Sequence, residues 1–452
     1  MNRLFLVLLV FSTLFVACEP DSTEWSAQTE NPDFLHQSMK KLTDVIVHDI
    51  FSPPVASRIY AYPSIAAYEV LRLNHPDYRS LAGQLNGLTA IPAPEAGKTY
   101  CYSLASVHAF LTVGRNMIFS EQKIEGFQNE LYQQYADAGV PESVIERSKA
   151  YGEAVAAHIM AWSDGDNYKQ TRTFPKFTIM DEPSRWQPTP PDYMDGIEPH
   201  WKEIRPFVIK SSDQFVPPPP TEFSMKPGSQ FYNEAMEVYE VMKTEEKDDR
   251  MEIAKFWDCN PYVSTHAGHV MFASKKITPG GHWIGITQLA AKKANSDMME
   301  TAQAYALVSI SLADAFISCW DEKYRSNLIR PETVINVYVD EDWRPALQTP
   351  PFPEYTSGHS VISRSAAIAL TSLYGDNFKF VDTVEEEYGL TVRSFNSFLE
   401  ASSEAAVSRL YGGIHYRPAI DNGVAQGEKV GKFIVETIIW KSNTAIGMKT
   451  SD

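Results

Sequence analysis

Three short stretches of the sequence carry side chains that suit the binding of a tetrahedral oxyanion. The first, Thr349–Ser360, reads T-P-P-F-P-E-Y-T-S-G-H-S and presents Ser357, Gly358 and His359 directly after a proline-rich segment. The prolines block a helix, and the apolar pattern that follows predicts a mostly buried helix ending at Gly375. A helix N-terminus offers free backbone N–H groups and the positive end of the dipole, which suits an oxyanion. The alternative is a serine N-cap with an incidental histidine beside it.

Two further stretches supply cations and a second histidine. Lys323 and Arg330 lie seven residues apart at the end of a long helical pattern, so both face the same way if the helix persists. Arg409 precedes paired glycines, which should turn the chain before His415. Each of these residues alone is ordinarily a solvated charge or a structural histidine. Together, bidentate guanidinium groups and a lysine ammonium complement a tetrahedral oxyanion.

The spacing within these stretches resembles the three-part signature of the type 2 phosphatidic acid phosphatase and vanadium-dependent haloperoxidase superfamily. The parts are Lys-x6-Arg-Pro from Lys323, Thr-Ser-Gly-His from Thr356 and Ser-Arg-x5-His from Ser408. The loop from Thr349, the segment 254–283 ending in T-P-G-G-H-W, and the early run A-Y-P-S-I-A-A-Y-E-V look like the haloperoxidase branch. The resemblance covers most of the mature chain.

This resemblance implies a role for each site residue. His415 would bind vanadium through a ring nitrogen or, in a phosphatase, would attack phosphorus. His359 would be the acid–base group. Five further residues would bind the oxygens of vanadate, or of phosphate in the same site: Lys323, Arg330, Ser357, Gly358 and Arg409. Vanadate would act as a Lewis acid on peroxide, which transfers oxygen to a halide.

The sequence also departs from the family pattern. Thr356 stands where a proline is usual. Many members carry an aspartate four residues after the final histidine to orient it, but here that position is Ala419 and the nearest carboxylate is Asp421. Arg325 and Asn327 occupy positions where haloperoxidases usually carry aromatic residues or histidine. The preferred halide therefore does not follow from the sequence.

Other polar residues have weaker claims on the site. Asp258 is either a partner of Arg409 or an ordinary carboxylate at a helix end. Asp314 and Asp321, on the long helix, are expected to be structural or to support the site. Ordinary hydrogen bonding is favoured over a separate metal site for a group of three histidines: His266, His269 and His282.

The elements that must position these residues are predicted to be helices. Apolar residues recur at helical spacing over 34–47, 56–73, 102–117, 143–162, 230–242, 248–257, 296–324, 391–410 and 424–440. Strand-like alternation is scarce, and Val334–Val339 is the best short case. The prediction is an all-α fold of two packed bundles, with a helical domain at 31–185, a proline-rich wrapping connection at 186–228 and a second helical domain at 229–445.

The N-terminus indicates export. Residues 1–17 combine Arg3 with an apolar run too short to span a membrane comfortably, as in a secretory signal. The following Cys18 resembles the lipidated cysteine of a bacterial lipobox, with residues 18–30 as a flexible tether. The alternative is an ordinary cleaved signal. We expect an exported, membrane-tethered lipoprotein, periplasmic or at the cell surface, with no other spanning segment.

Composition excludes some classes of function. The 452 residues carry a formal charge of −17, which argues against non-specific nucleic-acid binding. The remaining cysteines form no disulfide framework, although one pair could form, and none sits in a C-x-x-C zinc motif: Cys101, Cys259 and Cys319.

Three functions remain open at this point. The first is a haloperoxidase acting on small molecules, halide and hydrogen peroxide. The second is an acid phosphatase acting on a phosphomonoester through a phosphohistidine, and the third is a tethered protein that only binds an oxyanion. The sequence does not determine the substrate or the oligomeric state.

Overall fold

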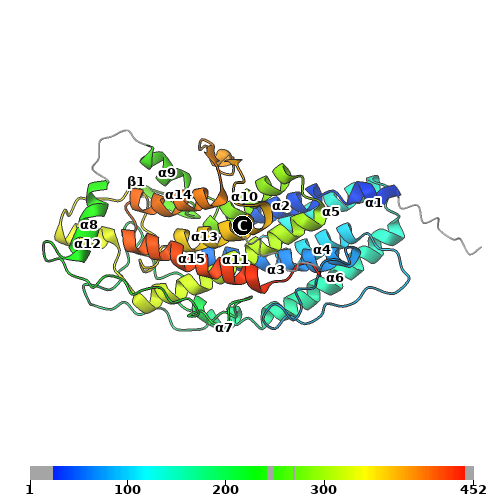
Figure 1. Ribbon diagram of the computed structural model, residues 1–452, viewed down its shortest axis with the longest axis horizontal. Helices are drawn as coiled ribbons and strands as arrows, with labels where there is room; N and C mark the ends of the chain where they lie inside the picture. The colour runs from blue at the N-terminus through cyan, green and yellow to red at the C-terminus, as the bar shows by residue number, and fades with distance from the viewer. Residues whose placement is uncertain (1–23, 242–248, 268–269, 443–452) are drawn as a thin grey trace, which may run out of the picture.

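One long helix, α11 (Met298–Ser326), runs through the middle of the molecule and carries Lys323 in its last turn (Figure 1). Asp297 and Glu300 form a capping box at its start. The helix packs against α3 (Pro53–Leu71) and α13 (Gly358–Tyr374). It is long and apolar enough to cross a membrane, but 94% of its most apolar window is buried inside the protein. It is therefore the central helix of the core. The expectation of no further apolar run of spanning length was wrong, because α11 has that length and apolar composition.

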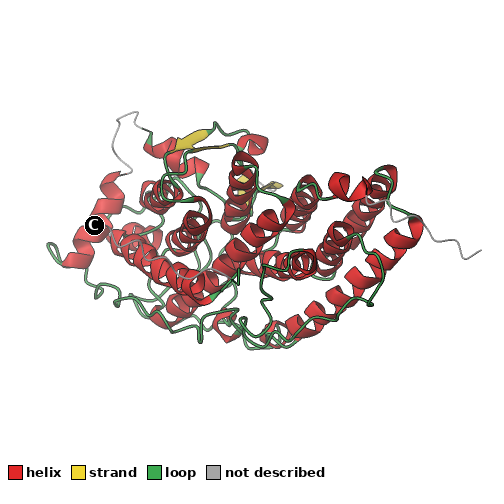
Figure 2. Cartoon of the chain, turned by 45° about the vertical axis from the view of Figure 1, so that its right-hand side comes forward, coloured by secondary structure: helices red, strands yellow, loops and turns green. Residues whose placement is uncertain are grey.

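The computed structural model describes residues 24–241, 249–267 and 270–442, and Figure 2 shows that the regular elements of this part of the chain are nearly all helices. The predicted all-α class is confirmed. The N-terminal half contributes α1 (Glu24–Thr29), α2 (Asp33–Asp49), α3, α4 (Tyr102–Arg115), α5 (Glu121–Asp137), α6 (Glu142–Asp164) and α7 (Tyr168–Thr171). The C-terminal half contributes α8 (Gln230–Val241), α9 (Arg250–Phe256), α10 (Pro279–Ala294), α11, α12 (Pro331–Tyr338), α13, α14 (Phe398–Tyr411) and α15 (Arg417–Thr437).

Within the described residues, strands are confined to two short antiparallel pairs. One pairs β1 (Tyr262–Ala267) with β2 (Val270–Lys275), and the other pairs β3 (Phe380–Asp382) with β4 (Arg393–Phe395). The predicted strand Val334–Val339 was wrong, because Pro331 at the first turn begins α12 and the apolar residues Val334 and Ile335 form its buried face.

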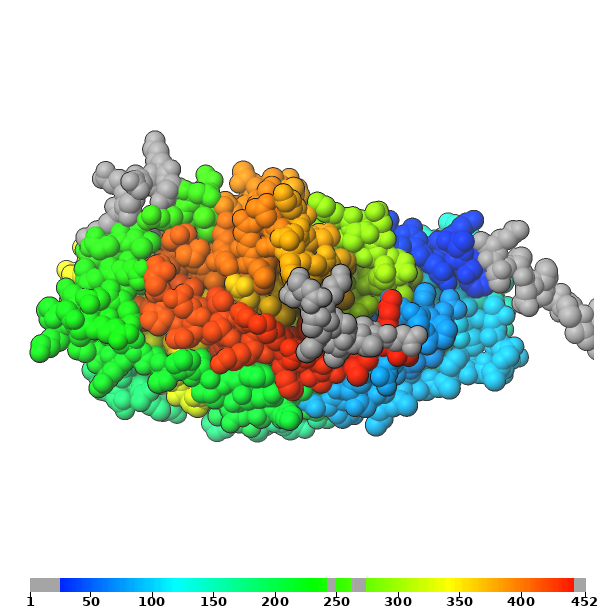
Figure 3. Space-filling model, viewed as in Figure 1, coloured from blue at the N-terminus to red at the C-terminus, as the bar shows by residue number. Residues whose placement is uncertain are grey.

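The two halves share a large hydrophobic core, which includes residues of α2, α3, α4, α11 and α13, and two smaller clusters lie in the C-terminal half. The chain after α15 returns to the N-terminal half, where Arg79 N–H donates to the Trp440 carbonyl at 2.7 Å. Figure 3 shows this end of the chain, in red, against the blue residues of the N-terminal half. The division into domains at 186–228 stays a prediction.

The proline-rich connection contacts α11 at two places. Its Phe207, Val208 and Ile209 backbone N–H groups donate to the buried carboxylate of Asp314 at 2.7, 2.7 and 2.9 Å. The first residue of the connection, Trp186, donates its backbone N–H to the Asn327 carbonyl at 3.0 Å. The connection thus fastens both the middle and the end of α11.

Several details differ from the sequence-based expectations. The apolar patterns of α5 and α10 were overlooked, and the pattern predicted from residue 391 begins with β4, so that α14 starts at Phe398. The expected flexible tether contains α1, whose Trp25 is buried in the core, so its last residues are ordered by packing. The predicted signal sequence and Cys18 lie outside the described residues, as does His269.

Candidate active site

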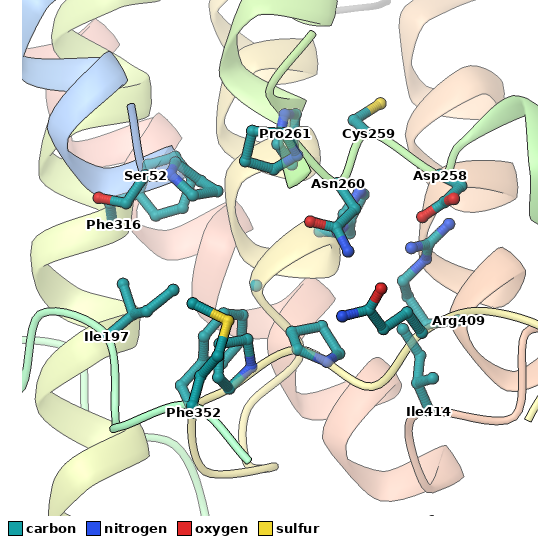
Figure 4. Close-up of a pocket in the computed structure, with 18 of the residues that line it drawn as sticks. Ser52, Ile197, Asp258, Cys259, Asn260, Pro261, Phe316, Phe352, Arg409 and Ile414 are labelled. Atoms are coloured by element: carbon teal, nitrogen blue, oxygen red, sulfur yellow. The ribbon is translucent and has the colours of Figure 1, made fainter. Parts of the chain in front are cut away.

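Two of the three stretches line a cavity of about 500 Å³ between α11, α13 and α14 (Figure 4). Lys323 and Arg330 of the remaining stretch do not line it, but they contact Glu354 and His415 of the other two. An apolar wall faces a polar one. The apolar wall includes Phe316, Trp320 and Phe352. The polar wall includes Asp258, Asn260, Gly358, His359, Arg409 and His415. The convergence inferred from the sequence is therefore present in the fold.

His415 is held by a carboxylate from the proline-rich loop. Its Nδ1 lies 2.7 Å from Glu354 Oε1, which also accepts the Tyr416 backbone N–H at 3.0 Å. An imidazole nitrogen that faces a carboxylate carries the proton, so Nε2 is left as the unprotonated nitrogen. Gly413, with φ 77°, turns the chain into this position, as the paired glycines predicted.

Burial determines the charge states of this pair. Burial, together with the charges of Arg330, Lys323 and Arg409, holds the pKa of His415 well below its usual value, so the ring is neutral. Burial also raises the pKa of Glu354 to about 7, against the opposing charges of Arg330 and Lys323. Its Oε2 has no partner among the described residues. A proton taken up there leaves the contact of Oε1 with His415 in place.

Arg330 reaches the site from outside α11. The long helix ends at Ser326, where Asn327 adopts a left-handed conformation with φ 49°, and Arg330 is instead the N-cap residue of α12. The condition that the helix persists is thus not met. The Arg330 guanidinium donates to the Phe352 and Ile414 carbonyls at 2.9 Å each, and its Nη1 lies 3.2 Å from His415 Nε2. Burial lowers the pKa of Arg330 to about 10, so it stays charged at neutral pH.

Lys323 holds the loop that carries Glu354. Its ammonium donates to the carbonyls of Pro353, Glu354 and Thr356 at 3.1, 3.1 and 2.6 Å. All three of its N–H donors are therefore used within the protein. Its side chain also lies close to Gly358, because a Cβ added to Gly358 would be 3.9 Å from Lys323 Cε. Burial lowers the pKa of Lys323 to about 7.

The start of α13 presents the second histidine. Ser357 is the N-cap, and its hydroxyl accepts the Ser360 N–H at 3.4 Å, so the capping role is real. Gly358 is the first helical residue and lies at the cavity, where the positive end of the dipole favours an anion. His359 follows in the first turn. Burial and the charge of Arg409 hold the pKa of His359 well below its usual value, while a hydrogen bond with the Trp257 backbone opposes them.

The Trp257 carbonyl also binds Arg409, at 2.6 Å from Nη2. Asp258 faces Arg409 across one side of the cavity (Figure 4). Its charge raises the pKa of Arg409 against the larger lowering effect of burial. Asp258 also forms an ion pair with Lys276 at 3.3 Å. Asp258 thus lies just past the end of α9 and also near Arg409, so both interpretations of this carboxylate stay open.

The carboxylate that orients His415 was missed by the sequence reasoning. Asp421 is exposed on α15, near the charge of Arg417. Ala419 contributes its carbonyl, which accepts the Ser357 N–H at 3.0 Å. The signal that could have identified Glu354 is a carboxylate inside the proline-rich loop itself.

The remaining candidates have structural roles. Asp314 is bonded to backbone N–H groups, and Asp321 pairs with Arg325. His282 is buried with two carboxylates, consistent with the expected hydrogen bonding. The three cysteines among the described residues are free and buried, so the disulfide that was left open does not form there.

Two buried nitrogens of the candidate active site have no hydrogen-bond partner among the described residues: Arg330 Nη2 and His359 Nε2. Buried polar atoms in native proteins are almost always paired, so these two indicate that a polar ligand belongs here. The guanidinium groups of Arg330 and Arg409 lie in this site and offer charged donors to an anion. The residues present thus fit a tetrahedral oxyanion.

Comparisons with known proteins agree with this chemistry. The family model described as the VCPO second helical-bundle domain matches residues 303–441, which contain all three stretches. No curated protein matches the chain. A crystal structure of the first bacterial vanadium-dependent iodoperoxidase is 54% identical, covers 92% of this chain and 98% of its own, and has a TM-score of 0.87.

More distant structures share the fold. Holo and apo structures of a bacterial vanadium-dependent chloroperoxidase, each 16% identical, have TM-scores of 0.68 and 0.65. The holo structure covers 86% of this chain and 93% of its own. The apo structure covers 85% of this chain and 94% of its own. On the identity and coverage of the iodoperoxidase, this chain belongs to the family of vanadium-dependent haloperoxidases.

Proposed function

We propose that the protein is a vanadium-dependent haloperoxidase that oxidises halide with hydrogen peroxide, and that iodide is its preferred halide. The observation that carries this proposal is the 54% identity to a bacterial iodoperoxidase over 92% of the chain. At that identity the two chains share the fold. The cavity, the neutral histidines and the guanidinium groups beside them are compatible with the proposal.

The residues of the site would divide the binding of vanadate among them. His415 would coordinate it through Nε2, because Glu354 keeps the proton on Nδ1. The oxygens would be bound by two guanidinium groups, the start of α13 and its capping serine: Arg330, Ser357, Gly358 and Arg409. Lys323, whose three N–H donors are used on backbone carbonyls, would contribute its charge and hold the loop that carries Glu354. Bound vanadate supplies a Lewis acid that polarises peroxide.

The protein's own groups provide proton transfer and enclosure. His359 is neutral, and its unpartnered Nε2 can accept a proton from hydrogen peroxide and return it later. The hydrogen bond with the Trp257 backbone holds the His359 ring in place at the wall of the cavity. The aromatic wall lowers the local dielectric, which strengthens each charge interaction in the site.

We further propose that the protein is exported and tethered to a membrane through a lipid on Cys18. The support is the pattern of residues 1–18 alone, a short apolar run after Arg3 and a small residue before the cysteine. Labelling cells with a radioactive fatty acid tests this, with Cys18→Ser as the control that should lose the label.

The proposed activity is tested by assaying iodide and bromide oxidation with and without vanadate, beside release of phosphate from a phosphomonoester. Halide oxidation that requires both vanadate and peroxide supports the proposal. Phosphate release that vanadate inhibits, without halide oxidation, overturns it in favour of the phosphatase. Vanadate binding without either activity would leave only a binding protein.

Two variants assign the histidines. His415→Ala should abolish vanadate binding and turnover, whereas His359→Ala should abolish turnover and leave vanadate bound. His158→Ala, on α6 and outside the cavity, is the control and should behave as the unaltered protein. Undiminished turnover in His415→Ala would remove this residue from the mechanism.

A further inference from the structure

Behind the polar wall of the cavity, side chains from three segments meet around the buried ring of His282 on α10. Cys259 comes from the segment between α9 and β1, and Glu385 from the segment after β3. The Nδ1 of His282 lies 3.3 Å from Cys259 Sγ and 3.0 Å from Glu385 Oε1, and these two atoms are 3.7 Å apart. A thiol, an imidazole nitrogen and a carboxylate oxygen therefore face one another at one point.

These separations match the edges of a tetrahedral zinc site. With bonds of about 2.3 Å to sulfur and about 2.0 Å to nitrogen and oxygen, the N···O edge is about 3.3 Å and the edges to sulfur are about 3.5 Å. The observed 3.0, 3.3 and 3.7 Å differ from those edges by a few tenths of an ångström. Cysteine, histidine and glutamate are all established zinc ligands.

The groups around this cluster also resemble the surroundings of a metal. Asp382 Oδ2 lies 2.8 Å from the other ring nitrogen of His282, the arrangement in which a carboxylate orients a metal-binding imidazole. Glu385 is 1% exposed, and its Oε2 has no hydrogen-bond partner among the described residues. This second oxygen is therefore not committed to another group among the described residues.

We propose that Cys259, His282 and Glu385 bind a zinc ion, with Asp382 as the residue that positions His282. Binding releases two protons, one from the Cys259 thiol and one from the His282 imidazolium, while Glu385 and Asp382 stay ionised. The total charge of the cluster is the same before and after, because the ion adds two charges and two protons leave.

Zinc at this position would brace the wall of the active site. The Trp257 ring stacks on His282 with centroids 4.7 Å apart and planes at 18°. The carbonyl of the same Trp257 binds Arg409. By joining three segments that are distant in the sequence, the ion would limit the movement of this wall, as structural zinc does elsewhere.

The competing account has a proton in place of the metal. His282 would then be an imidazolium between Asp382 and Glu385, beside a neutral thiol. Burial lowers the pKa of His282, but the charge of Asp382 and its hydrogen bond to the ring raise this pKa well above its usual value. The two accounts differ in the role of Cys259, which is a ligand in one and a bystander in the other.

The test is the metal content of the full chain, purified without chelator or histidine tag and measured by mass spectrometry of the elements. About one zinc per chain is expected in the unaltered protein, and less than about a tenth of that in Cys259→Ala and Glu385→Gln. Asp382→Asn should bind zinc about 10- to 100-fold more weakly. Cys101→Ala, which removes another buried free thiol, is the matched control and should keep its zinc.

A second measurement covers variants that fail to fold. The unaltered protein, stripped with a chelator and titrated with Co²⁺, should develop a thiolate-to-cobalt absorption band and a higher melting temperature. A protein that neither contains zinc nor develops this band overturns the proposal, as does a folded Cys259→Ala that keeps its zinc. No vanadate or halide enters either measurement, so the result is independent of the proposed activity.

Discussion

Replacing Glu354 with alanine is expected to weaken vanadate binding about 10- to 100-fold, because this carboxylate fixes the tautomer of the ring that would coordinate the metal. In the structure the carboxylate lies 2.7 Å from His415 Nδ1 and accepts the Tyr416 N–H at 3.0 Å. Without it, the proton can move to Nε2, where it would block coordination, and the ring can turn.

The magnitude has two parts. A loss of 10- to 100-fold in affinity corresponds to about 1.4–2.7 kcal/mol of binding free energy. Separately, the His415 Nδ1–H and the Tyr416 N–H lose their acceptor inside the protein, which costs about 1–3 kcal/mol of stability for each donor left unpaired. Glu354→Gln keeps an oxygen for both donors, so it should retain most of the affinity.

The assay is equilibrium dialysis of vanadate against the metal-free protein, together with the vanadate dependence of halide oxidation. Asp421→Ala is the control, because it removes the exposed carboxylate nearest in sequence to His415 and should leave both measurements unchanged. Equal vanadate affinity in Glu354→Ala and the unaltered protein would refute the reasoning. So would a loss in Asp421→Ala that equals the loss in Glu354→Ala.

Three further outcomes are expected. Burial places the pKa of both Lys323 and Glu354 at about 7, so raising the pH through 7 removes a positive charge and adds a negative one. Vanadate affinity measured by dialysis should therefore fall, by up to about tenfold per pH unit for each proton released. The fall should be less steep in Lys323→Arg. Asp314→Ala leaves the N–H groups of 207–209 without their acceptor and should lower the free energy of unfolding in urea by about 3 kcal/mol or more, while the folded fraction still binds vanadate. Gly413→Ala places a Cβ 3.2 Å from neighbouring atoms at φ 77°; it should cost about 1–2 kcal/mol of stability in the same assay and weaken vanadate binding by displacing the histidine two residues later.

The sequence by itself determined the class of fold and the chemistry of the site. Helical periodicity predicted most of the long helices, since a buried face repeats every three to four residues and is a local property. The three stretches were recognisable for the same reason, because the spacing of Lys323 from Arg330 and of Arg409 from His415 lies within one segment. Short patterns were less reliable, as at Val334, where the proline at the start of α12 decided for a helix.

Only the tertiary structure decided how the site is held together. Glu354 orients His415 across 61 residues of sequence, and the Trp257 carbonyl reaches Arg409 across 152. The neighbours of Cys259 are likewise brought together from α10 and from the segment after β3. Such contacts depend on how helices pack against one another, and a single sequence carries no local signal for the distance between two side chains on different helices.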